Sequence, residues 1–336
     1  MSGLPQRFNI LALSGGGFRG LFTATVLTRL EEQIGRPVAR CFNLICGSSV
    51  GGIIGMALAL EIPADEIRRL FESNGNHLFQ GRGWIPQLRD RLGLPDRRAK
   101  YSNAKLKELV CELFGKKTLE DSMRRLLITS VNFSTGRPQF FKTPHHPELR
   151  VDAKLLMSEV AMATSAAPVF FPAYQMEGSG SAYVDGGLAG NAPGLFGVHE
   201  AKHFLGQSDK DIQLLSIGTA GGLCCLDARN SLDMGAMRWR EHVVLLTLSA
   251  QESVADSMLC HELGDRYLKI DVAPNPEQKI NIDFDATDAA AIQTLKSLGD
   301  DAARHFLGKP KADAFLTHEA LPFNFHPRET EDLTHE

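Results

Sequence analysis

The sequence has few of the features that mark secreted, zinc-binding or nucleic-acid-binding proteins. Its 336 residues include six cysteines, with no C-x-x-C pair and no cysteine–histidine spacing typical of zinc. We therefore expect reduced cysteines, no disulfide framework and no metal site. The formal net charge of -4 excludes a broad basic surface, and with it a nucleic acid polymer as partner.

Long apolar runs are scarce as well. The N-terminus lacks a basic segment followed by an apolar one, so the sequence predicts no signal peptide. The longest apolar stretch, residues 50–60, is shorter than the roughly 20 residues that cross a bilayer as a helix. We expect a cytoplasmic protein, which would have to reach any membrane substrate peripherally.

Apolar runs alternate with segments of helical periodicity along most of the chain. Strands are predicted at 8–14, 42–46, 126–133, 138–142, 212–217 and 266–272, and helices at 21–34, 53–60, 63–71, 152–163, 234–259 and 288–306. Because the first strands are apolar throughout, both faces of the sheet should be covered by helices. The predicted fold class is α/β, with three α/β/α layers and a largely parallel central sheet. We expect one domain at 8–307 and an irregular polar tail at 308–336.

Residues 75–105 interrupt this alternation. The segment is rich in glycine, proline, arginine and lysine. One interpretation is a solvated insertion loop, since runs of charge are commonly solvated. The other is a mobile lid, or a surface for anionic groups such as lipid phosphates or a nucleotide.

A Gly-x-Ser-x-Gly pentapeptide at residues 47–51 stands between an apolar run and a predicted helix. The order strand, sharp turn, helix would expose the hydroxyl of Ser49 above the sheet and at a helix N-terminus, where a nucleophile is well placed. The pattern by itself is common, and it also fits an ordinary turn with a helix N-cap.

A second glycine-rich segment, Gly-Gly-Gly-Phe-Arg-Gly at 15–20, joins the first predicted strand to the first predicted helix. Both this loop and Ser49 follow the carboxyl ends of strands, so its backbone N–H groups are candidates for an oxyanion hole. The alternative is a phosphate cradle, but the spacing does not match G-x-G-x-x-G cleanly and no G-K-[ST] is present. The candidate oxyanion residues are Gly15, Gly16, Gly17, Phe18 and Arg19.

The expected proton acceptor for Ser49 is Asp185. It follows a short apolar run and precedes two glycines, in a loop that allows close approach to another backbone segment. Burial would raise its pKa and make it a better base. A plain Asx turn or a calcium-binding turn is the alternative. The eight histidines after position 190 lie in helical or tail contexts, which disfavours a Ser-Asp-His triad.

Taken together, four motifs resemble the patatin-like phospholipase family. They are the segments 15–20, 47–51, 164–168 (Thr-Ser-Ala-Ala-Pro) and 185–187, in the family's order, within about residues 8–220. Ser48 departs from the threonine that many members have there. The resemblance implies a patatin-like fold and a serine lipid acyl hydrolase with a Ser49–Asp185 dyad, no histidine, and no cofactor or metal for catalysis.

Segments 10–35, 215–219 and 265–270 are further similar to bacterial CapV-type effectors, which are patatin-like phospholipases of CBASS anti-phage systems. This similarity implies a cytoplasmic enzyme that attacks inner-membrane phospholipid after a cyclic dinucleotide, such as 3′,3′-cGAMP, binds. It also allows a homo-oligomer. The alternatives are an ungated housekeeping lipid acyl hydrolase and a catalytically idle module that binds a nucleotide through the loop 15–20. The sequence does not identify the nucleotide pocket.

Overall fold

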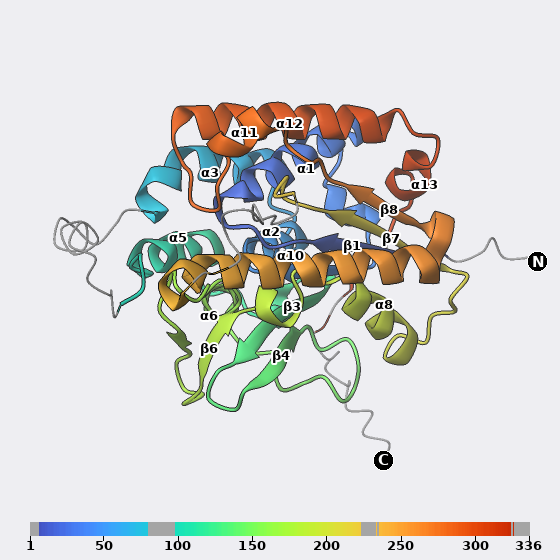
Figure 1. Cartoon of the computed structure of the whole chain (residues 1–336). Coiled ribbons are helices and arrows are strands. Elements are labelled where there is room, and N and C mark those ends of the chain that lie inside the picture. The colour runs from blue at the N-terminus through green and yellow to red at the C-terminus, as the bar shows by residue number, and fades with distance from the viewer. Residues whose placement is uncertain (1–6, 80–97, 223–232, 234, 324, 326–336) are drawn as a thin grey trace, which may run out of the picture.

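The computed structural model describes residues 7–79, 98–222, 233, 235–323 and 325, and the structural findings concern these residues (Figure 1). The strands are β1 (Phe8–Leu13), β2 (Leu44–Ser48), β3 (Arg125–Asn132), β4 (Arg137–Lys142), β5 (Tyr174–Gln175), β6 (Ala182–Asp185), β7 (Ile212–Ile217) and β8 (Tyr267–Ile270). The helices are α1 (Gly20–Ile34), α2 (Val50–Ala59), α3 (Ala64–Leu78), α5 (Ala104–Phe114), α6 (Met157–Thr164), α7 (Gly187–Gly190), α8 (Gly194–His203), α10 (Ala236–Leu263), α11 (Pro276–Asn281), α12 (Ala289–Leu307) and α13 (Ala312–Leu316).

The strands form one sheet in the order β5-β6-β3-β2-β1-β7-β8, and β4 pairs with β3 outside this path. The pairs from β3 through β2, β1 and β7 to β8 are all parallel. The pairs β3–β4, β3–β6 and β5–β6 are antiparallel. The prediction of a largely parallel sheet is therefore confirmed.

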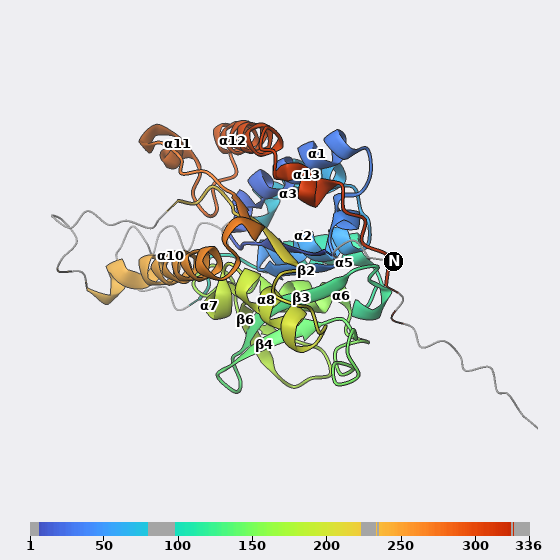
Figure 2. The same ribbon diagram turned by 90° about the vertical axis from the view of Figure 1, so that its right-hand side faces the viewer.

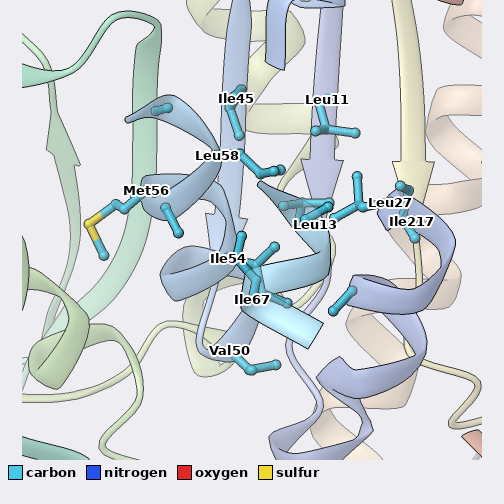
Figure 3. Close-up of a cluster of buried hydrophobic side chains, with 14 of the residues drawn as sticks. Leu11, Leu13, Leu27, Ile45, Val50, Ile54, Met56, Leu58, Ile67 and Ile217 are labelled. Atoms are coloured by element: carbon cyan, nitrogen blue, oxygen red, sulfur yellow. The ribbon is translucent and has the colours of Figure 1, made fainter. Parts of the chain in front are cut away.

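Helices cover both faces of the sheet, as the apolar strands predict. Along β1, Leu11 and Leu13 point to the larger core, where α1 and α2 pack on the sheet (Figure 3). Ile10 and Ala12 point the other way, to a smaller core that includes Leu259 near the end of α10. In Figure 2, α1 and α12 lie on one side of the strands and α8 on the other. The three-layer α/β/α architecture is confirmed.

Two expectations for local structure are wrong. The helix expected at 152–163 begins only at Met157, after a run of turns. The tail after residue 308 is not irregular throughout, because it contains α13, whose Phe315 and Leu316 are buried in the larger core. These apolar side chains make part of the tail a component of the domain.

The segment 75–105 is only partly described. Its first residues complete α3, and its last two begin α5. Residues 80–97, on which the lid and anion-surface interpretations depend, lie outside the described residues.

The expectation that no apolar segment is long enough to cross a membrane needs correction. Residues His242–Arg266, mostly within α10, are long and apolar enough by length and composition alone. A search for uninterrupted apolar runs misses this segment because Glu252 and Asp256 interrupt it.

Candidate active site

Ser49 stands at the sharp turn between β2 and α2. Its backbone has φ 53° and ψ -127°, a conformation that is rare for a residue with a side chain and is typical of strained functional turns. The turn is tight, and both flanking glycines pack directly against other backbone atoms. A Cβ at Gly47 would lie 2.5 Å from the Gly51 carbonyl oxygen, and one at Gly51 would clash with the Leu13 carbonyl. The pentapeptide therefore needs its two glycines for close approach.

Strand β3 brings Asp185 to this turn. β2 pairs with the first part of β3, with Ser48 opposite Thr129, and β6 pairs with the last part, with Asp185 opposite Ser130. Two consecutive residues of one strand thus align the serine turn and the acid. The Ser49 hydroxyl donates a hydrogen bond to Asp185 Oδ2 at 2.6 Å.

The carboxyl of Asp185 is buried, and this burial raises its pKa from an ordinary value of 3.8 to about 6. The hydrogen bond from Ser49 and a second one, from the Gly187 N–H to Oδ1 at 2.7 Å, act in the opposite direction by stabilising the charged form. The carboxylate is therefore more basic than an exposed one and is in contact with the hydroxyl proton. This arrangement can accept that proton near neutral pH.

Thr164 holds the backbone of the serine turn. Its hydroxyl accepts a hydrogen bond from the Ser49 N–H at 2.9 Å and donates one to the Thr129 carbonyl at 2.6 Å. The motif 164–168 contains this residue, but the sequence offers no signal for its partner, which is 115 positions away.

The glycine loop faces Ser49 with two available backbone donors. Of the five predicted oxyanion residues, Gly15 donates its N–H to the Asn191 carbonyl, Phe18 to the Phe284 carbonyl and Arg19 to the Gly16 carbonyl. The N–H groups of Gly16 and Gly17 have no hydrogen-bond partner within the described part of the chain. Both glycines line cavities that also contain Ser49. The loop can therefore offer these two donors to a developing negative charge.

The rest of the loop is braced from neighbouring segments. The Gly15 carbonyl accepts hydrogen bonds from Asn191 Nδ2 at 3.4 Å and from Thr219 Oγ1 at 3.3 Å. Arg19 lies against the chain after β7, since a Cβ on Gly221 would be 2.8 Å from its Cζ atom. Arg19 lines neither cavity next to Ser49.

Ser49 lies between two cavities of different character. The first, here called the α10 cavity, is lined by Asp185 and by Val244, Leu245 and Leu248 of α10. The second, the apolar cavity, encloses about 700 Å³ including the part open to solvent, and is lined almost wholly by aliphatic and aromatic side chains of α2, α3 and α5. Phe284 lines both cavities, and sequence reasoning gave no signal for this residue.

Histidine does not line either cavity in the described ranges. The buried His145 instead contacts Glu200 at 2.9 Å and Thr143 at 2.8 Å, remote from the serine turn. Desolvation lowers the pKa of His145. The described residues also contain no group of His, Cys, Asp and Glu that could hold a metal ion. The reactive groups that line the α10 cavity are the Ser49 hydroxyl and the Asp185 carboxylate.

Comparisons with known proteins show which family this chain belongs to. A family model described as patatin-like phospholipase matches residues 11–195. A cGAMP-activated phospholipase of Pseudomonas aeruginosa is 45% identical, over 97% of this chain and 97% of its own length. A cGAMP-activated phospholipase of Vibrio cholerae is 32% identical, over 92% of this chain and 94% of its own. The crystal structure of VipD from Legionella pneumophila aligns with 87% of this chain and 67% of its own, with a TM-score of 0.44 and 14% identity. This chain belongs to the patatin-like phospholipase family and is an enzyme of that class.

Proposed function

We propose that this enzyme hydrolyses the acyl esters of membrane phospholipids with Ser49 as nucleophile and Asp185 as general base. The observation that carries the proposal is the 2.6 Å hydrogen bond from the Ser49 hydroxyl to a buried carboxylate of raised pKa. A hydroxyl with a base in contact is the arrangement that nucleophilic catalysis needs.

In the first half of the reaction, Ser49 Oγ bonds to the ester carbonyl carbon while its proton passes to Asp185. The carbonyl oxygen becomes an oxyanion, which the N–H groups of Gly16 and Gly17 stabilise. The tetrahedral intermediate then expels the glycerol oxygen, which takes the proton from Asp185. In the second half, water gives a proton to Asp185 and attacks the acyl-serine, and collapse of the second intermediate returns that proton to Ser49 and releases the fatty acid.

The apolar cavity is the place we propose for the acyl chain. It reaches Ser49 and is lined by residues such as Ile53, Leu70 and Leu109. Burial of each methylene contributes about 0.8 kcal/mol, so a long chain would be bound strongly there. The α10 cavity is left for the glycerol side of the substrate.

We further propose that a cyclic dinucleotide such as 3′,3′-cGAMP activates the enzyme, as part of anti-phage defence carried out on the inner membrane from the cytoplasm. Support comes from two relatives that match this chain over nearly its full length and are named as cGAMP-activated phospholipases. A more distant relative from Escherichia coli, 28% identical, is named as cUMP-AMP-activated.

The test is release of fatty acid from phospholipid vesicles by the full chain, with no nucleotide, with 3′,3′-cGAMP and with cUMP-AMP. We expect release with 3′,3′-cGAMP and none with Ser49→Ala, which retains the fold. Retained activity in Ser49→Ala would refute the dyad. Equal activity with and without nucleotide would favour an ungated hydrolase, and tight nucleotide binding without hydrolysis under any condition would favour an idle module.

A further inference from the structure

The surface of α10 that points away from the protein is unusually apolar. Val243, Leu246, Val254 and Met258 expose 49%, 37%, 59% and 52% of their surface, at helical spacings that place them on one side with the exposed Ala250. We call these five residues the outer face of α10. Among the described elements, Figure 1 shows α10 crossing the front of the molecule, and the turned view places it toward the left (Figure 2).

The two acidic groups in the middle of this helix point the other way. Between His242 and His261 its charged residues are Glu252 and Asp256, and both pair with Lys269 of β8, Glu252 at 2.9 Å and Asp256 at 2.5 Å. Asp256 also accepts a hydrogen bond from Tyr267 at 2.7 Å. The outer face is therefore apolar, with the exposed Ser257 and His261 beside it at helical spacings from Val254. Glu252 and Asp256 lie on the inner side. An exposed apolar surface of this kind marks an interaction site.

The inner side of the same helix belongs to the active site. Val244, Leu245 and Leu248 line the α10 cavity next to Ser49 and Asp185. Gln251 donates a hydrogen bond to the Leu188 carbonyl at 2.8 Å, in the loop that carries the acid. One helix thus has one side in the catalytic cavity and the other in solvent.

We propose that the outer face of α10 docks on the surface of a phospholipid bilayer and so places the α10 cavity at the lipid interface. This inference rests on the proposed function, because it takes the substrate to be a bilayer lipid. The contacts of Glu252, Asp256 and Gln251 tie the helix to the protein, so it lies on the membrane and does not span it. A protein partner on this face would cover the helix that lines the cavity next to Ser49, whereas a bilayer would bring the substrate to that cavity.

The first experiment measures flotation of the full chain with vesicles of phosphatidylethanolamine and phosphatidylglycerol. All proteins carry Ser49→Ala so that the lipid stays intact, and the assay is run with and without 3′,3′-cGAMP. The test variant is Val243→Ser with Val254→Ser. The matched control is Val151→Ser with Leu321→Ser, two valine or leucine side chains that are 91% and 81% exposed elsewhere on the surface.

We expect the test variant to lose about tenfold or more of its vesicle binding and the control to lose none, since binding of an interfacial helix scales with its buried apolar area. Circular dichroism checks that the test variant and the control are folded. If the double test variant does not fold, Val254→Ser alone replaces it. Unchanged vesicle binding in the test variant would overturn the proposal. If the test variant instead changed the oligomeric state of the protein in light scattering and left vesicle binding unchanged, the outer face would be a contact between copies of this chain and the proposal would be overturned.

A second experiment separates this inference from the proposed function. With Ser49 restored, the test variant should hydrolyse a short, water-soluble ester at the wild-type rate and vesicle lipid about tenfold more slowly, because the change affects docking and not the dyad. Equal losses on both substrates would contradict a docking role. Absence of hydrolysis in the wild type would refute the dyad while the flotation result still decides the docking.

Discussion

Replacement of Asp185 by asparagine should stabilise this enzyme while inactivating it, and the gain should depend on pH. Asparagine has nearly the same shape and can keep both hydrogen bonds, with Oδ1 accepting from Gly187 and Nδ2 donating to the Ser49 hydroxyl. It removes the buried negative charge and the proton acceptor together. Such a trade between stability and activity is common where a catalytic group is held in an unfavourable environment.

The size of the effect follows from the pKa of Asp185, which is 3.8 ordinarily and about 6 in the folded enzyme. Because the folded pKa is the higher one, the protonated carboxyl favours folding and its contribution is lost as pH rises through 6. Below pH 4 the two proteins should be close in stability. Above pH 6 the wild type should be less stable by about 3 kcal/mol, the equivalent of that shift in pKa. At pH 5 the difference should be about half of this.

The assay is urea unfolding of both proteins at pH 5 and pH 8, with fatty acid release measured on the same preparations. Asp301→Asn is the control, since its exposed carboxylate pairs with Arg304 on the surface. We expect inactivity of Asp185→Asn at both pH values and a larger stability gain at pH 8. A gain that does not change with pH would refute the raised pKa. A normal rate of hydrolysis would refute the role of Asp185 as base.

Three further predictions concern the same site. The value of kcat/KM should fall about tenfold per pH unit below pH 6 as Asp185 becomes protonated, and a flat profile from pH 5 to pH 8 would contradict this. Thr164→Val leaves the Ser49 N–H and the Thr129 carbonyl unpaired, so it should cost about 1–3 kcal/mol in urea unfolding and lower the rate. Thr164→Ser should restore both the stability and the rate. A Thr164→Val variant as stable as the wild type would count against a stabilising role for the Thr164 hydrogen bonds. Leu109→Trp narrows the apolar cavity, so hydrolysis of long-chain esters should fall relative to short-chain ones. An unchanged chain-length profile would place the acyl chain elsewhere.

Much of the fold was predictable because its central strands are apolar on both faces. β1 and β2 are buried at every position, which leaves a continuous apolar run as the sequence signal. The juxtaposition of Ser49 and the glycine loop was predicted because parallel strands end at one edge of the sheet. The place of Asp185 beside them was predicted from the motifs of a family, since β6 runs antiparallel to β3. The roles of these residues in catalysis stay predictions until the variants are assayed.

Other features depend on contacts between distant segments and leave no local signal. The carbonyl of Phe284 accepts a hydrogen bond from the Phe18 N–H at 2.9 Å, which removes Phe18 from the predicted oxyanion donors. Any residue can supply a carbonyl, so the sequence at position 284 is uninformative. The apolar character of α10 was hidden for a similar reason, because Glu252 and Asp256, the acids in its apolar stretch, pair with Lys269 of the following strand.

The alignment of both halves of the dyad on β3 has a consequence for how this enzyme tolerates insertions and deletions. The distance between Ser49 and Asp185 is set by the pairing of two neighbouring β3 residues. Thr129 lies opposite Ser48, and Ser130 lies opposite Asp185. One residue inserted between Thr129 and Ser130 would move the acid by a strand step of about 3.3 Å and turn the following side chains to the other face. Residues added to the exposed β3–β4 turn would change neither register. Length variation among functional homologues should therefore collect in that turn and be absent from the middle of β3.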